Sequence, residues 1–233
     1  MNIHDSYSGE IDDSINEDIK DDKNLHNLSM SFKEDKSRIY NKWAESYDKY
    51  VEKEEYLGPK NLIEHVKSYF FNTTGTINIL DFGCGTGLVG KEIKNIFKNL
   101  NFDITGVDIS TGMILQSHKL NIYDDLVCSD IVDKNKNISE VKRIFKDKTF
   151  NLIVSCGVFL EGHVSLEAIF RVLVNLLSDY GGILAVTIRD SFLNSTPEFK
   201  YRLNQSKEIV VLEFSQIEYL KGVKAWLLIV AKN

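Results

Sequence analysis

Cysteine is scarce in this sequence of 233 residues, which contains three of them, Cys84, Cys128 and Cys156. They are widely spaced and none belongs to a CxxC pair. They therefore match neither the ligand spacing of a zinc site nor the dense pairing of a disulfide framework. We expect reduced thiols close to buried strands, and no metal site.

Long hydrophobic runs are also absent. No apolar segment approaches the ~18 residues that a membrane-spanning helix needs. The N-terminal segment MNIHDSYSGE has neither the basic start nor the apolar centre of a signal peptide. We therefore expect a cytoplasmic protein without a membrane partner.

The sequence has no excess of basic residues. Its formal net charge is −6, and all of that charge lies in residues 1–36, which hold ten Asp or Glu against four Lys. The rest of the chain is neutral overall, so charge-driven binding to nucleic acid is not expected. Residues 1–36 are also poor in aromatic side chains and cannot bury enough surface to offset their ordering entropy. We predict that they form a disordered acidic tail.

Residues 37–75 predict a helical N-terminal cap. A first apolar stripe follows the i, i+3, i+4, i+7 spacing of a helix over residues 38–54. Gly58-Pro59 then breaks the chain, and the same spacing returns over residues 62–70.

In residues 76–233, short β-rich runs alternate with helical segments. The β-rich runs lie at 77–82, 103–107, 125–128, 150–155 and 183–188, and the helical segments lie at 88–97, 113–120, 139–145 and 166–177. This alternation of apolar strands and helices predicts an α/β fold with a doubly wound, mostly parallel sheet. Two further runs, 209–214 and 226–231, flank a turn at Lys221-Gly222 and predict an antiparallel C-terminal strand pair.

A glycine-rich turn follows the first of these strands. Residues 79–87 read Ile-Leu-Asp-Phe-Gly-Cys-Gly-Thr-Gly, so a buried strand leads to Gly83, Gly85 and Gly87, and a helix starts at Leu88. Glycine permits unusual backbone angles and has no Cβ to hold a ligand away from the backbone. The helix N-terminus beyond the turn presents unpaired N–H groups. The turn is therefore a candidate ligand-binding loop.

Acidic side chains follow the next two strands. Asp108 ends the second strand, and Asp130 follows the third. In a doubly wound sheet, ligands lie across the carboxyl ends of the strands. Asp108 would lie beside the glycine turn, placed to accept hydrogen bonds from both hydroxyls of a ribose. The sequence therefore predicts a nucleoside site at this edge of the sheet.

These motifs resemble those of class I S-adenosylmethionine-dependent methyltransferases. The resemblance covers residues 38–190 and rests on residues 80–87, on residues 106–110 with Met113, and on Ser129-Asp130. It implies the seven-stranded, Rossmann-like sheet of that family, S-adenosylmethionine as the cofactor and S-adenosylhomocysteine as the product. Residues 40–48 and 157–164 are similar to those of methyltransferase-like proteins of the Williams–Beuren syndrome region 27 group, and residues 76–233 would be the cofactor-binding domain.

The resemblance implies a cofactor site of fourteen residues. They are Trp43, Tyr47, Asp81, Gly83, Cys84, Gly85, Gly87, Asp108, Ile109, Ser110, Met113, Asp130, Ile131 and Cys156. Gly83 and Gly85 would pass the methionine part of the cofactor, and Asp108 would bind its ribose. Tyr47 and Trp43 would close over the methionine end, where aromatic rings attract a positive sulfur. Packing in the core of an amphipathic helix is the other interpretation of these two rings.

The adenine part would be held at the next strand ends. Ile109 and Met113 would flank the base, and Asp130 would accept a hydrogen bond from its exocyclic amine, with Ile131 nearby. Methyl transfer from a sulfonium is a direct displacement that depends mainly on positioning. The resemblance thus implies a methyltransferase acting on a small molecule. Residues 155–158 are not the aromatic-proline tetrapeptide of enzymes that methylate an amino group of adenine or glutamine.

Two other functions remain open at this stage. Residues 85–90 satisfy GxGxxG, with Asp108 about 20 residues further on, as in an NAD-dependent Rossmann enzyme. That interpretation leaves Asp130 and the aromatic helix of residues 40–48 unused, so we favour the methyltransferase. The other alternative is a protein that binds S-adenosylmethionine or S-adenosylhomocysteine without catalysis, because no catalytic base can be assigned from the sequence.

His163 is the candidate catalytic residue, since it follows the fourth strand and an imidazole there can take a proton from an incoming nucleophile. A loop histidine bonded to the backbone is the other interpretation. Cys84 and Cys156 have no sequence neighbour that would lower their thiol pKa, so we interpret them as small buried side chains rather than nucleophiles. No motif indicates the oligomeric state or the identity of the methyl acceptor.

Overall fold

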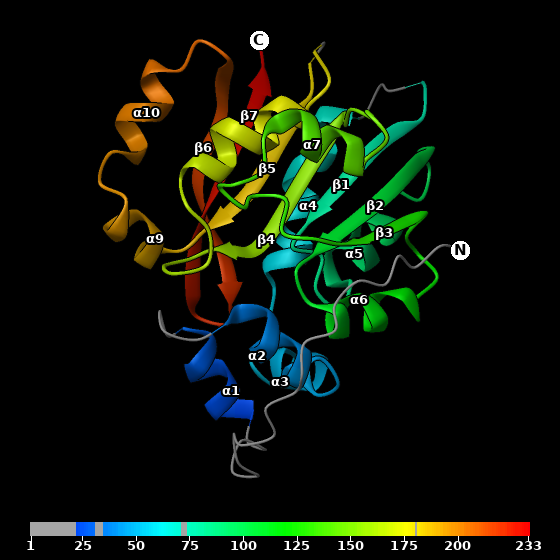
Figure 1. The fold of residues 1–233 in the computed structure, drawn as a ribbon, viewed down its shortest axis with the longest axis vertical. Helices are drawn as coiled ribbons and strands as arrows, with labels where there is room; N and C mark the ends of the chain where they lie inside the picture. The colour runs from blue at the N-terminus through cyan, green and yellow to red at the C-terminus, as the bar shows by residue number, and fades with distance from the viewer. Residues whose placement is uncertain (1–21, 31–34, 71–73, 180) are drawn as a thin grey trace.

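A computed structural model describes residues 22–30, 35–70, 74–179 and 181–233. In this part of the chain, seven strands form one sheet in the order β3-β2-β1-β4-β5-β7-β6 (Figure 1). The strands are β1 (Ile77–Phe82), β2 (Phe102–Asp108), β3 (Asp125–Cys128), β4 (Leu152–Phe159), β5 (Ile183–Ile188), β6 (Ile209–Leu220) and β7 (Val223–Lys232). Strands β1 to β5 are parallel, and β7 lies antiparallel between β5 and β6. The predicted doubly wound, mostly parallel sheet with an antiparallel C-terminal pair is confirmed.

Helices precede, connect and flank these strands. They are α1 (Asp22–Ser29), α2 (Lys36–Trp43), α3 (Tyr47–Lys53), α4 (Gly58–Lys67), η1 (Ser68–Phe70), α5 (Leu88–Ile96), α6 (Thr111–His118), α7 (Ile138–Ile144), η2 (Ala168–Leu173), α8 (Val174–Leu176), α9 (Asp190–Ser195) and α10 (Phe199–Gln205). η1 is a 3₁₀ turn and η2 is π-helical. Among the described residues, no helix combines the length and the apolar character that crossing a membrane would require.

The two faces of the sheet carry separate hydrophobic clusters, because successive side chains of a strand point to opposite faces. On β1, Ile77 and Ile79 pack with α4 and α5, whereas Leu80 and Phe82 pack with α7, η2 and α9. Helices therefore cover both faces, as the apolar strands predicted. Because the helices cover both faces, a ligand can reach the backbone of the sheet at the carboxyl ends of the parallel strands.

Two boundaries in the N-terminal cap differ from the prediction. The single helix expected over residues 38–54 is divided, because α2 ends at Trp43 and α3 begins at Tyr47. The Gly58-Pro59 pair was expected to break the chain but forms the first turn of α4. Proline is tolerated there, since the first N–H groups of a helix have no intrahelical partner.

The C-terminal half also departs from the prediction in two places. Residues 166–177, expected as one helix, form η2 and the short α8. No helix was predicted within residues 189–208, yet they contain α9 and α10. These two short helices bury Phe192 and Phe199 against the sheet, and packing rather than periodicity therefore accounts for them.

The predicted disordered tail is wrong for residues 22–29, while residues 1–21 and 31–34 lie outside the described residues. Residues 22–29 form α1, whose Leu25 is buried against Ile39 and Trp43. Composition could not show this contact, because the partners of Leu25 come from α2. Figure 1 shows α1, α2 and α3 gathered beyond the carboxyl ends of the parallel strands.

Candidate functional site

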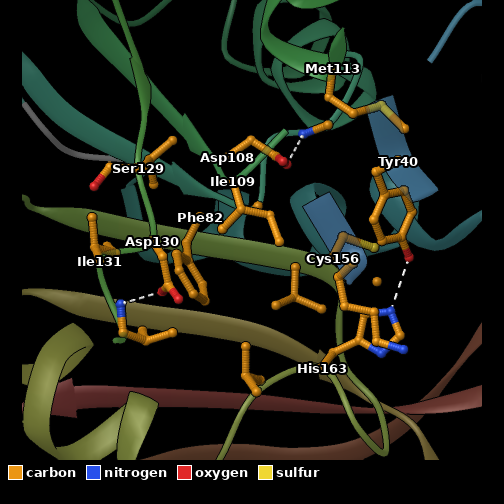
Figure 2. Close-up of a pocket in the computed structure, with 18 of the residues that line it drawn as sticks. Tyr40, Phe82, Asp108, Ile109, Met113, Ser129, Asp130, Ile131, Cys156 and His163 are labelled. Carbon is orange, nitrogen blue, oxygen red and sulfur yellow. Dashed lines mark hydrogen bonds between the residues drawn. The ribbon is translucent and has the colours of Figure 1, made fainter. Parts of the chain in front are cut away.

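A pocket opens at the carboxyl ends of β1 to β4, where the strands face α2 and α3. It holds about 840 Å³ of empty space, its open mouth included. Ten of the fifteen predicted site residues line it: Tyr47, Gly83, Gly85, Asp108, Ile109, Met113, Asp130, Ile131, Cys156 and His163. Figure 2 shows Asp130 and Ile131 at one side of this pocket and His163 at the other.

The turn after β1 has its shape because its three glycines adopt left-handed backbone angles. The φ values are +71° at Gly83, +53° at Gly85 and +96° at Gly87, a region that side chains with a Cβ disfavour. The N–H of Gly83 donates to the carbonyl oxygen of Val107 at 2.8 Å, which folds the turn toward β2. A Cβ on Gly85 would find no atom within 4 Å. The backbone at Gly85 therefore faces open space in the pocket.

Asp108 is fixed by two backbone donors from opposite sides. The N–H of Gly85 donates to Oδ2 at 2.9 Å, and the N–H of Ser110 donates to Oδ1 at 2.8 Å. Burial nevertheless raises the pKa of Asp108, against the lowering effect of the N–H groups of Ser110, Gly85 and Ile109. The ionised carboxylate is thus incompletely solvated, and further donors from a ligand would stabilise it.

Asp130 reaches the same pocket from the end of β3. Its Oδ1 accepts a hydrogen bond from the N–H of Val132 at 3.0 Å, so the carboxylate stabilises the turn in which it lies. The N–H of Ser129 donates to the carbonyl oxygen of Asp108 at 2.9 Å and joins the two strand ends. The glycine turn, Asp108 and Asp130 consequently surround one pocket and are not separated by core side chains.

The cap helix α2 is attached to the start of α6 by Asn41. Its side-chain Oδ1 accepts from the hydroxyl of Ser110 at 2.7 Å and from the N–H of Gly112 at 2.8 Å. A Cβ on Gly112 would lie 3.0 Å from the backbone of Asn41, so the two helices approach closely. This contact places Tyr40, the neighbour of Asn41, in the pocket wall.

His163 forms a hydrogen-bonded pair with Tyr40 at the other side of the pocket (Figure 2). Its Nε2 lies 3.0 Å from the Tyr40 hydroxyl, and its Nδ1 lies 3.3 Å from the carbonyl oxygen of Glu161. Burial lowers the pKa of His163 to about 4, the charge of Lys36 acts in the same direction, and the Glu161 carbonyl opposes them. The imidazole is therefore neutral at physiological pH.

Five predicted site residues support the pocket from behind and do not line it. They are Trp43, Asp81, Cys84, Gly87 and Ser110. Trp43 is 2% exposed and packs edge-on against Tyr47, with ring centroids 5.0 Å apart. It belongs to the core of the cap and does not line this pocket, and its predicted position over the methionine end of the cofactor stays a prediction.

The other four hold the turn and the neighbouring helices in place. Gly87 precedes α5, and a Cβ there would lie 2.6 Å from the side chain of Leu120. Ser110 caps α6 by accepting from the N–H of Met113 at 3.1 Å. Asp81 and Cys84 are buried, and burial raises the pKa of both.

The three thiols are free, Cys84 and Cys156 are buried, and Cys128 is exposed at the end of β3. Burial raises the pKa of Cys156 to about 12, so this pocket-lining thiol is protonated and a poor nucleophile. The residues that the structure describes contain no cluster of three or more His, Cys, Asp or Glu side chains suited to a metal ion.

Several pocket residues were not predicted from the sequence. They include Lys36, Tyr40, Phe82, Ser129, Val132, Gly157, Val158 and Val164. A signal existed for Tyr40, because it lies seven residues before Tyr47 and therefore on the same side of the helical stripe. Lys36 carried no comparable signal, since tertiary contacts alone bring it to the pocket.

Comparisons with known proteins agree with this geometry. Residues 80–184 match a family model described as a methyltransferase domain. The chain is 27% identical over 199 residues to malonyl-[acyl-carrier protein] O-methyltransferase 1 of Ilyobacter polytropus, covering 77% of this chain and 68% of that protein. It is 26% identical over 193 residues to human methyltransferase-like protein 27, covering 82% and 70% of the two chains.

Solved structures share the fold. The plantazolicin methyltransferase BamL, in complex with a triazolic desmethylPZN analog and SAH, aligns with a TM-score of 0.60 at 16% identity over 91% of this chain and 96% of that chain. The methyltransferase BpumL, with a pentazolic analog and SAH, aligns with a TM-score of 0.58 at 14% identity over 91% and 99%. At such identities the likeness shows the fold alone.

Proposed function

We propose that this chain is a class I S-adenosylmethionine-dependent methyltransferase that transfers the methyl group of that cofactor to a small molecule. The match of residues 80–184 to a methyltransferase domain and the similarity to methyltransferase-like protein 27 support this proposal. The observation that carries the proposal is the convergence of the glycine turn, Asp108 and Asp130 on one pocket. The family match favours this function over the NAD-dependent alternative, and Gly90 supports the same choice. A Cβ on Gly90 would lie 2.6 Å from the hydroxyl of Tyr123, so this glycine packs against protein.

The residues present fit an adenosyl cofactor. The space in front of Gly85 admits a ligand close to the backbone, and the incompletely solvated carboxylate of Asp108 calls for hydroxyl donors. We propose that Asp108 holds the ribose and that Gly83 and Gly85 pass the methionine part. Cys156 and Tyr47 would lie beside that part.

The adenine would occupy the side of the pocket formed by the ends of β2 and β3. Ile109 and Met113 supply apolar surface there, and Met113 is buried. The side-chain Oδ2 of Asp130 has no hydrogen bond within the described residues, so it is available to accept from an exocyclic amine. Ile131 would complete this half of the site.

When bound, S-adenosylmethionine supplies a methyl group on a positively charged sulfur, already activated for direct displacement. The task of the chain is then to align the acceptor and exclude water, which can supply about 7–11 kcal/mol of rate acceleration in favourable cases. Tyr40 and Tyr47 line the pocket and offer aromatic rings to a positive charge.

His163 is unsuited to take a proton directly at neutral pH, because burial lowers its pKa to about 4. We propose that it positions Tyr40 through the hydrogen bond to Nε2. The proton of the acceptor would then leave to water.

Isothermal titration calorimetry of the purified chain tests the cofactor assignment. We expect binding of both S-adenosylmethionine and S-adenosylhomocysteine, and no heat with NADH under the same conditions. If neither S-adenosylmethionine nor S-adenosylhomocysteine binds, the proposed function is wrong. Binding of NADH alone would restore the dehydrogenase interpretation.

Catalysis needs a second measurement, because a protein could bind the cofactor without transferring its methyl group. The chain is incubated with methyl-tritiated S-adenosylmethionine and a fractionated metabolite extract. We expect labelled product in a small-molecule fraction. A similar protein supports this choice of acceptor, since the methyltransferase BamL is complexed with a desmethylPZN analog. Binding without any labelled product would favour a non-catalytic cofactor-binding protein.

A further inference from the structure

A second cavity adjoins the pocket on the side of the N-terminal cap. It holds about 810 Å³ of empty space, its open mouth included. Tyr40, Tyr47 and Gly157 line both cavities. A molecule in the second cavity therefore borders the place where the first cavity ends, as a methyl acceptor must.

Aromatic rings dominate the lining of the second cavity. They are His26, Tyr40, Trp43, Tyr47, Tyr50, Tyr56 and Tyr219. Several of them pack face to edge; Trp43 and Tyr50, for example, have ring centroids 5.1 Å apart and planes at 61°. Rings arranged in this way hold one another in place and offer flat apolar surface, which suits a planar ligand.

One positively charged side chain, that of Arg189, lies among these aromatic rings. Arg189 follows β5, and its backbone N–H donates to the carbonyl oxygen of Phe159 at 2.9 Å, which fixes its position at the strand end. Its guanidinium carbon lies 4.8 Å from the ring centroid of Tyr219. The guanidinium forms no hydrogen bond or ion pair with any residue that the structure describes. Its donors are therefore available to a ligand.

Aromatic rings also attract cations. The charges of the side chains that line this cavity, however, disfavour a cationic ligand. Arg189 lines the cavity and would repel a cation. Burial lowers the pKa of His26, so this imidazole adds no second positive charge for a ligand to balance. Glu54, the acidic residue of the lining, is exposed. Burial raises the pKa of Tyr47, Tyr56 and Tyr219, so these hydroxyls remain neutral.

Trp43 adds a second donor without an acceptor. It lines the cavity, and its buried Nε1 has no hydrogen-bond partner among the described residues. A ligand with acceptor oxygens matches the donors of Arg189. A planar guanidinium binds a carboxylate through two parallel hydrogen bonds, and one guanidinium balances one carboxylate charge.

We propose that the second cavity is the acceptor site and that it takes a planar molecule with a carboxylate, which Arg189 holds, while the methyl group goes to another atom of the same molecule. This inference rests on the proposed function. Arg189 lines the second cavity and not the first, so the carboxylate it holds lies on the second cavity's side of the boundary formed by Tyr40, Tyr47 and Gly157. An ion-paired carboxylate is also a weak nucleophile.

The reacting atom is therefore a hydroxyl oxygen or an amine nitrogen at that boundary. This atom forms the new bond to the methyl carbon as the carbon–sulfur bond breaks. The sulfur keeps the electron pair of the broken bond, and the proton of the acceptor leaves to water.

Matched acids and amides test the inference on the full chain saturated with S-adenosylhomocysteine. The probes are 4-hydroxyphenylacetate with 4-hydroxyphenylacetamide, and indole-3-acetate with indole-3-acetamide, titrated by calorimetry and by saturation-transfer NMR. We expect at least one acid to bind ten times more tightly than its amide. Equal affinities within both pairs, or no binding by either acid at millimolar concentration, would overturn the proposal.

Variants assign the preference to one side chain. We expect Arg189→Gln to abolish the difference between acid and amide, and Arg189→Lys to keep part of it. Arg202→Gln is the matched control, because Arg202 pairs with Glu167 on the surface, outside both cavities. A full preference in Arg189→Gln rejects the assignment, and if that variant does not fold, a preference in Arg189→Lys as large as in the wild type rejects bidentate binding.

The affinity for S-adenosylhomocysteine is measured first in every variant. If the wild-type chain does not bind S-adenosylhomocysteine, the result contradicts the proposed function itself. Normal affinity without discrimination between acids and amides would count against the acceptor chemistry alone.

Discussion

The hydroxyl of Tyr40 lies 3.0 Å from Nε2 of His163, which is 123 residues away in the sequence. A carbonyl oxygen can only accept, so the contact of Nδ1 with the oxygen of Glu161 places the imidazole proton on Nδ1. Nε2 is then the acceptor, and Tyr40 donates to it. The pair joins α2 to the loop after β4 and depends on a neutral histidine.

A pH-dependent contribution of His163 to stability follows from this arrangement. Burial lowers the pKa of His163 from 6.5 to about 4, so the unfolded chain binds a proton at a higher pH than the folded chain does. The contribution is complete above pH 6.5 and is lost as the pH falls toward 4. We expect the stability advantage of the wild type over His163→Gln, measured by urea unfolding, to shrink steadily over this window.

His118→Gln is the control for this experiment, because His118 is exposed on α6. Its unfolding curves should follow those of the wild type across the same pH range. An unchanged difference between wild type and His163→Gln from pH 7 to pH 4.5 would show that the histidine titrates normally and that Tyr40 is not held in this way.

Much of the site could be predicted because its residues lie in short, contiguous motifs at strand ends. Gly83, Gly85 and Asp108 come directly after β1 or at the end of β2, and parallel strands bring such positions together. Arg189 also follows a parallel strand, but a lone arginine carries no motif. Its position beside Tyr219 depends on β6 and β7, which fold back from the end of the chain.

Errors in the prediction arose where tertiary packing decides between local alternatives. Trp43 and Tyr47 share one helical stripe in the sequence, yet α2 ends at Trp43 and α3 begins at Tyr47, and only Tyr47 of the two lines the pocket. The composition of residues 1–36 predicted disorder, and the surface of α2 that covers Leu25 was not visible in composition. The fold class needed only periodicity, whereas these positions needed contacts.

Alanine substitutions should separate the structural and the binding roles of the glycine turn. A Cβ on Gly83 would lie 2.3 Å from Cγ2 of Val158, whereas a Cβ on Gly85 would meet no atom within 4 Å. We expect Gly85→Ala to lose about 1–2 kcal/mol of stability, the cost of the left-handed backbone, and to weaken S-adenosylhomocysteine binding. Gly83→Ala should lose more stability. Urea unfolding and calorimetry measure the two effects.

Gly222→Ala provides the reference for backbone strain alone, because Gly222 has a φ of +71° and open space at its Cβ position, and it lies in the β6–β7 turn, outside the lining of the pocket. Its stability loss should equal that of Gly85→Ala, with unchanged cofactor affinity. Equal affinity in both variants would mean that no ligand approaches the backbone at Gly85.

Asp108→Asn tests the ribose assignment directly. Charge-assisted hydrogen bonds contribute about 1.5–3 kcal/mol each, so removing the charge should weaken S-adenosylhomocysteine binding at least tenfold by calorimetry. Asp103→Asn is the matched control, because Asp103 lies at the other end of the same strand and outside the pocket. Wild-type affinity in Asp108→Asn would refute the assignment, whatever its stability.

Asp81 should make the folded chain less stable as the pH rises. Its Oδ2 accepts from the hydroxyl of Tyr123 at 2.7 Å, and its buried Oδ1 has no partner among the described residues. Burial raises the pKa of Asp81 from 3.8 to about 7, helped by the charge of Asp108 and opposed by Tyr123. The folded state then binds the extra proton, so the stabilisation is complete below pH 3.8 and is lost as the pH rises through 7.

Asp81→Asn removes this titration while keeping an acceptor for Tyr123. We expect the stability of Asp81→Asn relative to the wild type, measured by urea unfolding, to increase between pH 4 and pH 8 by up to about 1.4 kcal/mol per pH unit. In Tyr123→Phe, the pH-dependent loss of stability seen in the wild type should occur at higher pH, because this variant lacks the donor that lowers the pKa of Asp81. Parallel pH profiles for wild type and Asp81→Asn would mean that Asp81 stays ionised in the fold, and its carboxylate would then need a partner in the turn.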